Sequence, residues 1–263
     1  MTTLGAVCLP QVPPERLREV AMAAEDSGLD ELWLWEDCFW GGAVPACAAA
    51  LAWTGRLRVG IGVLPVPLRN VVTTAMDTAM LHRLFPDRVV IGVGHGVQTW
   101  MRQVGAGAES PMTLLREQLT ATRALLRGEK VTAEGRYVRL DEVTLEWPPL
   151  SPVPLISAAT GDRTLRLSGE VADGTILVAG TGPDEVRRAR GLIDEGRAAA
   201  GRDDEHRLIV YMSVPGVAAA DADEVSTAVR SLGAAGADTV VLQPTNESLD
   251  PVDLIRFTTS LDV

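Results

Sequence analysis

The sequence is poor in cysteine and in lysine. Its three cysteines, Cys8, Cys38 and Cys47, have an odd total and no CxxC spacing. This pattern argues against a disulfide framework and against a structural zinc site, and it favours a reducing, cytoplasmic environment. Lys130 is the single lysine beside many arginines.

Histidine is almost as scarce, and the catalytic motifs that use it are missing. His82, His95 and His206 lie far apart along the chain, without the paired spacing of metal ligands. There is also no G-x-S-x-G elbow and no Cys–His context typical of a nucleophilic enzyme. We therefore expect no metal site and no covalent catalysis by serine or cysteine.

Positive charge and long apolar runs are lacking as well. The net charge is −11 and the pI is about 4.8, which argues against nucleic acid or an anionic membrane as a partner. The longest uncharged apolar stretch, from Ala43 to Trp53, is far below the ~20 residues that a membrane span needs. Residues 1–10 carry no basic segment before their apolar residues, so we expect no signal peptide.

The sequence does contain a regular alternation of strand-like and helix-like segments. The strand-like runs are short and mostly apolar on both faces, as in buried parallel strands. They lie at Leu4–Leu9, Glu31–Trp35, Leu57–Leu64, Arg88–Val93, Val153–Ala159, Thr175–Ala179, Leu208–Val214 and Asp238–Leu242. Helical patterns fill the gaps at Pro14–Ser27, Val44–Thr54, Val71–Phe85, Pro111–Arg127, Asp162–Val171, Pro183–Ala200, Ala222–Ala235 and Pro251–Leu261.

Eight strand–helix repeats over ~250 residues are typical of an α/β fold of the (β/α)8 TIM-barrel type. A doubly wound sheet usually has five or six strands, so the count favours the barrel. We expect one domain over residues 1–263. The one irregularity is Glu129–Pro152, which we interpret as an excursion with a hairpin turn at residues 132–137.

In TIM barrels the active site lies at the carboxyl ends of the strands. His95, between Gly94 and Gly96, follows the fourth strand-like run and is a candidate proton donor. The alternative is a tight turn with a solvated histidine. Glu36 and Asp37 follow the second run, and one of these carboxylates could have a raised pKa suited to proton transfer. The alternative is that one caps the next helix and the other is solvated.

The segment Gly161–Gly174 is the most informative stretch. It places a helix that begins on a glycine, with Arg163 in its first turn, between two strand-like runs. The free N–H groups of such a helix start and its dipole attract a phosphate.

This segment resembles a signature of the luciferase-like flavin and deazaflavin oxidoreductases, which reads roughly G-P-K-x-L-R-L-A-G-E-x-A-D-G. Segments in the same order along nearly the whole chain resemble the same family. They are most similar to the branch that uses coenzyme F420 and includes the methylenetetrahydromethanopterin reductases. The resemblance implies a luciferase-like barrel.

Individual residues follow from the resemblance. In the second-strand exit, Asp37 matches the family aspartate, Cys38 stands where a histidine is usual, and Trp40 matches a tryptophan; the resemblance implies that Cys38 and Trp40 contact substrate. Residues 62–70 resemble a segment where a bulge with a non-prolyl cis peptide presses on the deazaflavin ring. Leu64 and Pro65 are the residues expected there, with Leu64 behind the ring.

The same resemblance implies the remaining cofactor contacts. Gly94 and Gly96 would pass close to the ring, and the phosphate would be held by two loops. These contain Ala159, Thr160, Gly161 and Arg163, and Gly180 and Thr181.

The resemblance therefore implies an oxidoreductase that moves a hydride between coenzyme F420 and a small organic substrate. One alternative is an FMN-dependent monooxygenase that uses O2 and needs a flavin reductase as partner. Another is a non-catalytic barrel with a degenerate site, for which Cys38 is the best support. The sequence leaves open whether the protein forms a homodimer.

Overall fold

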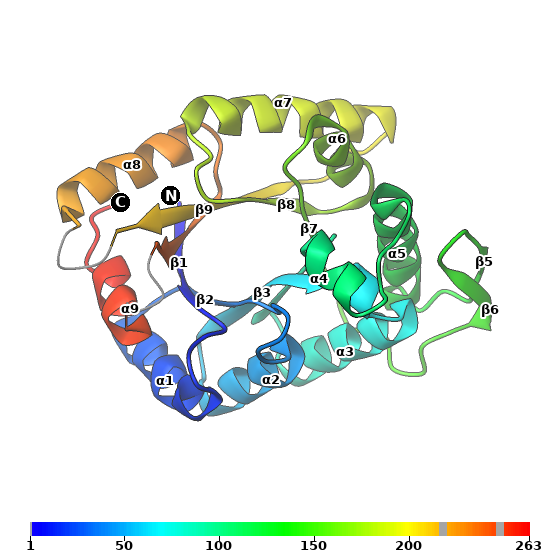
Figure 1. Cartoon of the computed structure of the whole chain (residues 1–263), viewed down its shortest axis with the longest axis horizontal. Coiled ribbons are helices and arrows are strands. Elements are labelled where there is room, and N and C mark those ends of the chain that lie inside the picture. Colours follow the sequence, from blue (N-terminus) through cyan, green and yellow to red (C-terminus); the bar gives the residue numbers. More distant parts are fainter. Residues whose placement is uncertain (1, 216–219, 246–249) are drawn as a thin grey trace.

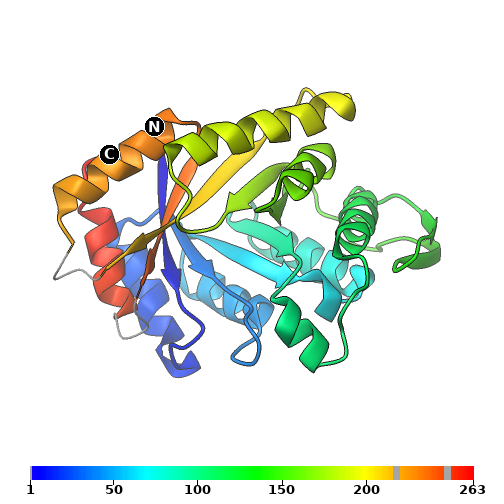
Figure 2. The same ribbon diagram turned by 45° about the horizontal axis from the view of Figure 1, so that its top comes forward.

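The computed structural model describes residues 2–215, 220–245 and 250–263. Within them, eight parallel strands close into a barrel in the order β1-β10-β9-β8-β7-β4-β3-β2 (Figures 1 and 2). The strands are β1 (Thr3–Cys8), β2 (Glu31–Leu34), β3 (Arg58–Pro65), β4 (Val89–Gly94), β7 (Leu155–Ala158), β8 (Gly174–Leu177), β9 (Arg207–Val214) and β10 (Thr239–Pro244). The predicted TIM barrel is confirmed.

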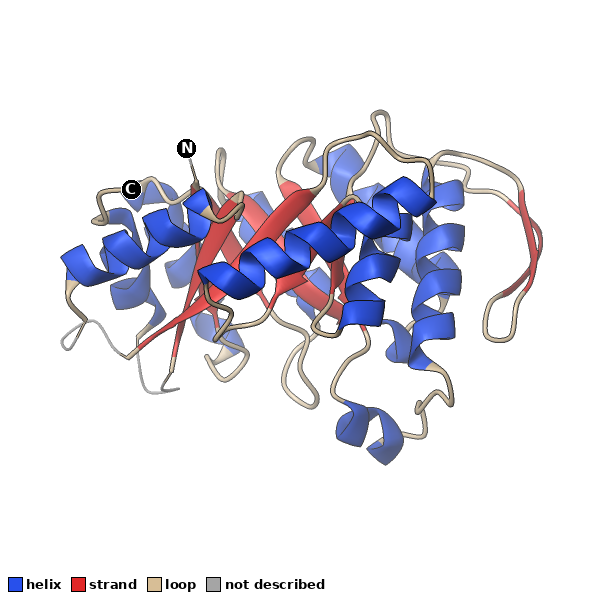
Figure 3. Ribbon diagram, turned by 90° about the horizontal axis from the view of Figure 1, so that it is seen from above, coloured by secondary structure: helices blue, strands red, loops and turns tan. Residues whose placement is uncertain are grey.

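The helices surround the barrel in Figure 1, and Figure 3 shows from the side that they lie across the strands. They are α1 (Leu17–Ser27), α2 (Ala43–Trp53), α3 (Val71–Leu84), α4 (Gln98–Gln103), α5 (Pro111–Leu126), α6 (Asp162–Val171), α7 (Pro183–Ala199), α8 (Ala222–Ala234) and α9 (Pro251–Thr259), with 3-10 turns η1 (Pro14–Arg16) and η2 (Val66–Leu68). Several helix starts carry side-chain caps. Asn70 and Asp250 accept hydrogen bonds from the first turns of α3 and α9.

The expected excursion is a two-stranded antiparallel hairpin, β5 (Val131–Glu134) and β6 (Arg139–Val143), which extends outward beyond α5 (Figure 1). Glu117 on α5 fixes its turn, because its carboxylate accepts hydrogen bonds from three successive backbone N–H groups, those of Arg136, Tyr137 and Val138. The hairpin is thus tied to the helix layer and leaves the barrel mouth open.

The strands bury both of their faces, which is why they read as continuous apolar runs. One face packs against the helices in a large core that includes Leu32, Ile61 and Leu64. The other fills the barrel interior with a smaller cluster that includes Trp33, Ile209 and Tyr211. The barrel is therefore packed through its centre, and the strand ends are where a ligand can enter.

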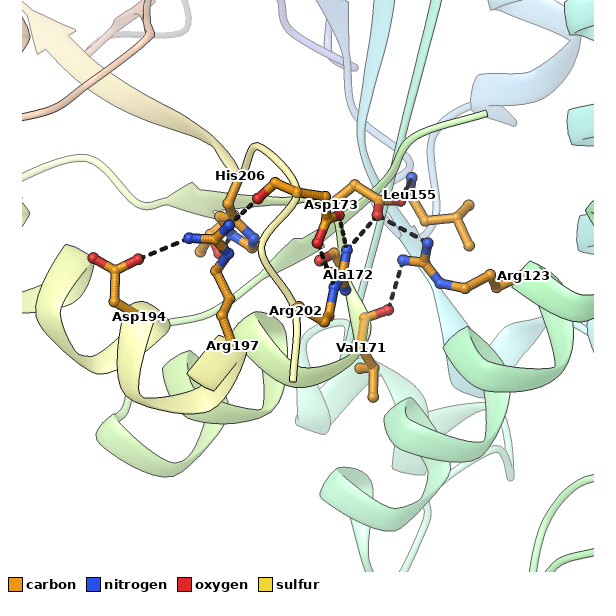
Figure 4. A network of polar contacts seen from close by, with 11 residues as sticks. Arg123, Leu155, Val171, Ala172, Asp173, Asp194, Arg197, Arg202 and His206 are labelled. Atoms are coloured by element: carbon orange, nitrogen blue, oxygen red, sulfur yellow. Dashed lines mark hydrogen bonds and ion pairs between the residues drawn. The ribbon is translucent and has the colours of Figure 1, made fainter. Parts of the chain in front are cut away.

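The amino ends of β7 and β8 are joined by an ion network centred on Asp173 (Figure 4). Its carboxylate accepts hydrogen bonds from the backbone N–H of Leu155 at 2.8 Å and from Arg202 at 2.7 Å, and it pairs with Arg123 at 2.8 Å. Asp173 ends the Gly161–Gly174 segment. This part of the segment therefore stabilises the barrel on the side opposite the candidate active site.

Protonation of His206, beside this network, is expected to destabilise the fold in mild acid. Its Nε2 lies 2.8 Å from the Thr175 hydroxyl, and burial followed by the charge of Arg190 and other arginines lowers its pKa from 6.5 to about 4. The neutral side chain stabilises the fold fully above pH 6.5, and this stabilisation is lost as the pH falls from 6.5 towards 4. Between about pH 6.5 and about pH 5 the protonation of His206 alone should lower the free energy of unfolding by roughly 1–2 kcal/mol.

Urea denaturation at several pH values measures this loss. The His206→Gln variant cannot take up the proton, so its stability should depend less on pH in the same range. An equally steep pH dependence in the variant would show that other groups cause the acid sensitivity.

Candidate active site

A cavity of about 630 Å³ opens at the carboxyl ends of the barrel strands. We call it the barrel-mouth cavity. Its lining comes from the ends of β2, β3, β4, β7, β8, β9 and β10 and from α4. The residues are Trp35, Glu36, Asp37, Gly62, Val63, Pro65, His95, Gly96, Val97, Gln98, Trp100, Ala158, Ala159, Thr160, Ile176, Val178, Ala179, Tyr211 and Gln243.

Irregular pairing of β3 shapes one wall of this cavity. The register with β4 shifts between Ile61 and Leu64, so that Gly62 and Val63 both lie on the barrel side. The Gly62–Val63 peptide is cis, at the segment where the resemblance implied a non-prolyl cis bond. Val63 lines the cavity.

Because of the bulge, Leu64 does not lie where the sequence analysis expected it. Its side chain is 1% exposed and belongs to the core between strands and helices, so it does not line the cavity. A strictly alternating strand with Ile61 facing the helices would turn Leu64 inward. The extra residue of the bulge reverses that phase, and Val63 takes the position expected of Leu64.

Two of the predicted glycines allow close packing next to this wall. A Cβ atom on Gly94 would lie 2.9 Å from a methyl group of Val63, and one on Gly96 would lie 2.9 Å from Pro65. Gly96 also has a φ of +64°, a conformation that other residues adopt at a cost. Gly94 lies beneath Val63, whereas Gly96 and Pro65 line the cavity.

Tyr211 connects the barrel interior to the cavity. Its ring lies 5.8 Å from that of Trp35, and its hydroxyl donates a long hydrogen bond of 3.4 Å to the carbonyl oxygen of Gly62. Burial raises the pKa of Tyr211. The phenol therefore stays protonated and holds two walls of the cavity together.

Glu36 lies at the cavity, but both of its carboxylate oxygens are already engaged. Arg69 donates to each of them at 2.8 Å, and the backbone N–H of Ala43, the first residue of α2, donates at 2.9 Å. Glu36 thus satisfies a helix start, as in the capping alternative, and anchors the second-strand exit. Its catalytic role stays a prediction that this geometry does not favour.

Among the described residues, Asp37 and His95 also line the cavity and can change their charge. Burial raises the pKa of Asp37, whose carboxylate makes no ion pair with the described residues. Burial lowers the pKa of His95 from 6.5, and a hydrogen bond with the Pro111 backbone partly opposes this. The His95 Nδ1 atom is buried without a hydrogen-bond partner of normal geometry. Both residues line the cavity, so both are candidates for exchanging a proton with a ligand.

The predicted phosphate loops lie next to the cavity, at the end of β7 and the end of β8. Ala159 and Thr160 line the cavity, and Gly161 is the cap of α6 with open space around its Cα. Arg163 follows in the first turn, exposed and without an ion pair among the described residues. Asp162, where the family has proline, pairs with Arg188 on α7.

The second phosphate loop has a similarly open backbone. Gly180 has a φ of +89° with nothing near its Cα, and the hydroxyl of Thr181 donates to the carbonyl of Val178 at 2.7 Å. The structure therefore brings Gly161, Arg163, Gly180 and Thr181 to the same end of the barrel. Their contact with a phosphate stays a prediction.

The two predicted substrate contacts are not in the barrel-mouth cavity. Cys38 is half-buried and does not line it, and burial raises the pKa of its thiol. Trp40 lines a separate, neighbouring cavity instead. Both residues sit on the second-strand exit, which turns outward after Asp37. Their substrate contacts remain predictions.

Sequence reasoning missed several residues of the site. Val63 was hidden by the bulge, and Tyr211 lies inside an apolar strand-like run. A tyrosine in such a run is itself a signal, because its hydroxyl needs a partner when buried. Gln98 and Trp100 lie on α4, which falls outside the predicted helical segments.

No three metal-ligating side chains gather within the part of the chain that the structure describes. No helix in those residues combines the length and the apolar character that a bilayer crossing demands.

Comparison with known proteins places this geometry in context. The family model for luciferase-like monooxygenases matches residues 2–253. A 5,10-methylenetetrahydromethanopterin reductase of Methanolobus tindarius is 31% identical over 76% of this chain and 61% of its own length. An F420-dependent glucose-6-phosphate dehydrogenase of Nakamurella multipartita is 33% identical over 66% of this chain and 55% of its own. The chain thus spans about six-tenths or less of these curated relatives.

Solved structures share the fold. An F420-dependent secondary alcohol dehydrogenase, solved with an F420–acetone adduct, superposes with a TM-score of 0.89 at 20% identity, covering 99% of each chain. The coenzyme F420 dependent tetrahydromethanopterin reductase of Methanopyrus kandleri gives a TM-score of 0.85 at 20% identity, covering 98% of this chain and 97% of its own. By the match of its family model, the chain belongs to the luciferase-like monooxygenase family.

Proposed function

We propose that the protein is an oxidoreductase that uses coenzyme F420 to reduce or oxidise a small organic substrate. The observation that carries the proposal is the barrel-mouth cavity itself. Its wall is the Gly62–Val63 bulge, and an unpaired arginine at an open helix start lies beside it. The names of the curated relatives support F420 rather than another cofactor.

The residues present fit this cofactor. Val63, Pro65 and Gly96 offer a wall without bulky polar groups to a flat ring, and the amides after Gly161 with Arg163 offer an anion site. When bound, coenzyme F420 supplies or accepts a hydride at its C5. The protein contributes orientation, exclusion of water and control of the proton.

We assign the proton to His95. In ketone reduction the substrate carbon gains a hydride and its oxygen gains a proton, which the protonated imidazole donates. In alcohol oxidation the neutral imidazole removes the hydroxyl proton as the hydride leaves. The lowered pKa of His95 favours the neutral form near pH 7, and thus its action as a base.

Cofactor titrations test the proposal. The purified protein should bind F420, followed by its fluorescence, at least about ten-fold more tightly than FMN, since selective contacts to a cofactor ring are of that order. Tighter binding of FMN would favour the FMN-dependent monooxygenase. Binding of neither would favour a non-catalytic barrel.

A further inference from the structure

A second cavity, of about 640 Å³, lies beside the barrel mouth. It is enclosed by the loop after β1, the loop after β2 and one face of α2. We call it the aromatic cavity. It is lined by Cys8, Leu9, Pro10, Gln11, Val12, Pro13, Pro14, Leu17, Leu34, Trp35, Phe39, Trp40, Gly41, Gly42, Ala43, Pro45, Ala46, Ala49 and Trp53.

Aromatic side chains are concentrated here in a chain that has few of them. Of the six tryptophans in the sequence, Trp35, Trp40 and Trp53 line this cavity, together with Phe39. Phe39 and Trp40 are each 59% exposed. Large apolar rings left in water around a hollow are typical of a binding site for an apolar ligand.

Trp35 connects the aromatic cavity to the candidate active site. Its side chain lines both cavities, and it follows β2 directly. Tyr211 packs against its ring from the barrel side at 5.8 Å. One molecule could therefore place its reacting carbon in the barrel-mouth cavity and an apolar group against Trp40 and Phe39.

The charges around both cavities select against an anionic ligand. No lysine or arginine lines either cavity among the described residues, whereas Glu36 and Asp37 line the barrel mouth. Arg69, behind Glu36, is held by that carboxylate and by Asp77. The remaining segments, residues 216–219 and 246–249, contain no lysine or arginine in their sequence. A phosphate or carboxylate on the substrate would thus meet carboxylates without a cation.

We propose that the aromatic cavity is a subsite for the apolar part of an uncharged substrate whose reacting carbon lies in the barrel-mouth cavity. This proposal rests on the proposed function and narrows its substrate class to neutral molecules with a bulky apolar group. Phosphorylated sugars, which the names of several relatives specify, fall outside that class.

Filling the aromatic cavity tests the subsite without any known substrate. Ala49 on α2 lines it, so Ala49→Trp should weaken binding of the neutral fluorescent dye Nile red by about ten-fold. Ala52→Trp is the matched control, because Ala52 is an exposed residue of the same helix that lines neither cavity, and its dye affinity should equal that of wild type. If Ala49→Trp does not fold, Trp40→Ser on an exposed loop is the second test, and it should also lower the affinity for the dye.

The charge selection needs a competition experiment. We expect 4-methylcyclohexanone to displace Nile red at about ten-fold lower concentration than 4-oxocyclohexanecarboxylate, which replaces the methyl group by an anion. Equal displacement by the two ketones would overturn the substrate class. Wild-type dye affinity in folded Ala49→Trp or in Trp40→Ser would overturn the subsite.

A parallel F420 titration separates this proposal from the function on which it rests. All variants should bind F420 with wild-type affinity, because the predicted phosphate loops and Val63 lie on the other side of Trp35. Weaker dye binding together with unchanged F420 binding in the variants supports the subsite. A wild-type protein that never binds F420 contradicts the proposed function, while the dye experiment still decides whether the cavity takes apolar ligands.

Discussion

The His95→Ala variant is expected to lose about 10²–10⁴-fold in turnover, the usual contribution of a positioned acid or base, while its affinity for F420 changes little. The reason is that the His95 side chain lines the barrel-mouth cavity, where a substrate can exchange a proton with its imidazole. Its removal leaves the glycine walls and the predicted phosphate loops in place. Steady-state turnover, with a separate F420 titration, measures the two effects.

The pH profile shows whether the lost group is the histidine. Because burial lowers the pKa of His95 from 6.5, ketone reduction should slow as the pH rises through a value below 6.5. Alcohol oxidation should accelerate over the same range. Both transitions should vanish in His95→Ala.

Two further variants complete this test. His82→Ala removes a histidine from α3, in the helix layer, and should retain turnover. If His95→Ala keeps near-wild-type turnover while Asp37→Asn loses it, the proton belongs to Asp37, whose raised pKa also suits a donor. The histidine would then be only a turn residue.

The barrel could be predicted because its strands are buried on both faces. Every residue of β4 is buried, for example, so an unbroken apolar run was enough to find it. The helical pattern from Val71 likewise gave the start of α3. In contrast α4 has six residues and one buried side chain, Met101. So short a helix is not stabilised by its own sequence, and tertiary contacts decide that it forms.

The wall of the cavity could not be predicted in detail, because a bulge breaks the period of two on which strand reasoning depends. The resemblance indicated a bulge at residues 62–70, yet it did not show where the extra residue falls. That position decides between Val63 and Leu64. Likewise the cavity near Trp40 depends on how the second-strand exit folds outward, which no local pattern encodes.

The Gly161–Gly174 segment shows how one signature can serve two purposes. Its first residues face the barrel mouth, but a Cβ on Gly169 would lie 2.1 Å from the carbonyl oxygen of Ile193, and Asp173 organises the ion network at the opposite end. Most of the segment is therefore needed for the packing of α6 against α7 and β8. Only its start bears on cofactor binding.

A second large effect, on cofactor affinity, is expected from a substitution at the start of the Gly161–Gly174 segment. Arg163→Glu should weaken F420 binding by about ten- to a hundred-fold, because it replaces a charge-assisted contact to the phosphate by repulsion. The neighbouring carboxylate of Asp162 is already paired with Arg188, so Arg163 is the charge in the first turn of α6 that is free to meet the phosphate. Fluorescence titration of folded protein measures the change.

Arg18→Glu is the matched control. Arg18 is an exposed residue of α1 without an ion pair among the described residues, and its reversal changes the net charge by the same amount. If the phosphate contact is local, Arg18→Glu should bind F420 as wild type does. Added salt should steeply lower the F420 affinity of wild type and of this control but not that of Arg163→Glu, because salt screens the attraction that Arg163 supplies. Equal weakening in the two variants would show that overall charge governs binding. Unchanged affinity in Arg163→Glu would place the phosphate away from α6, and with it the ring.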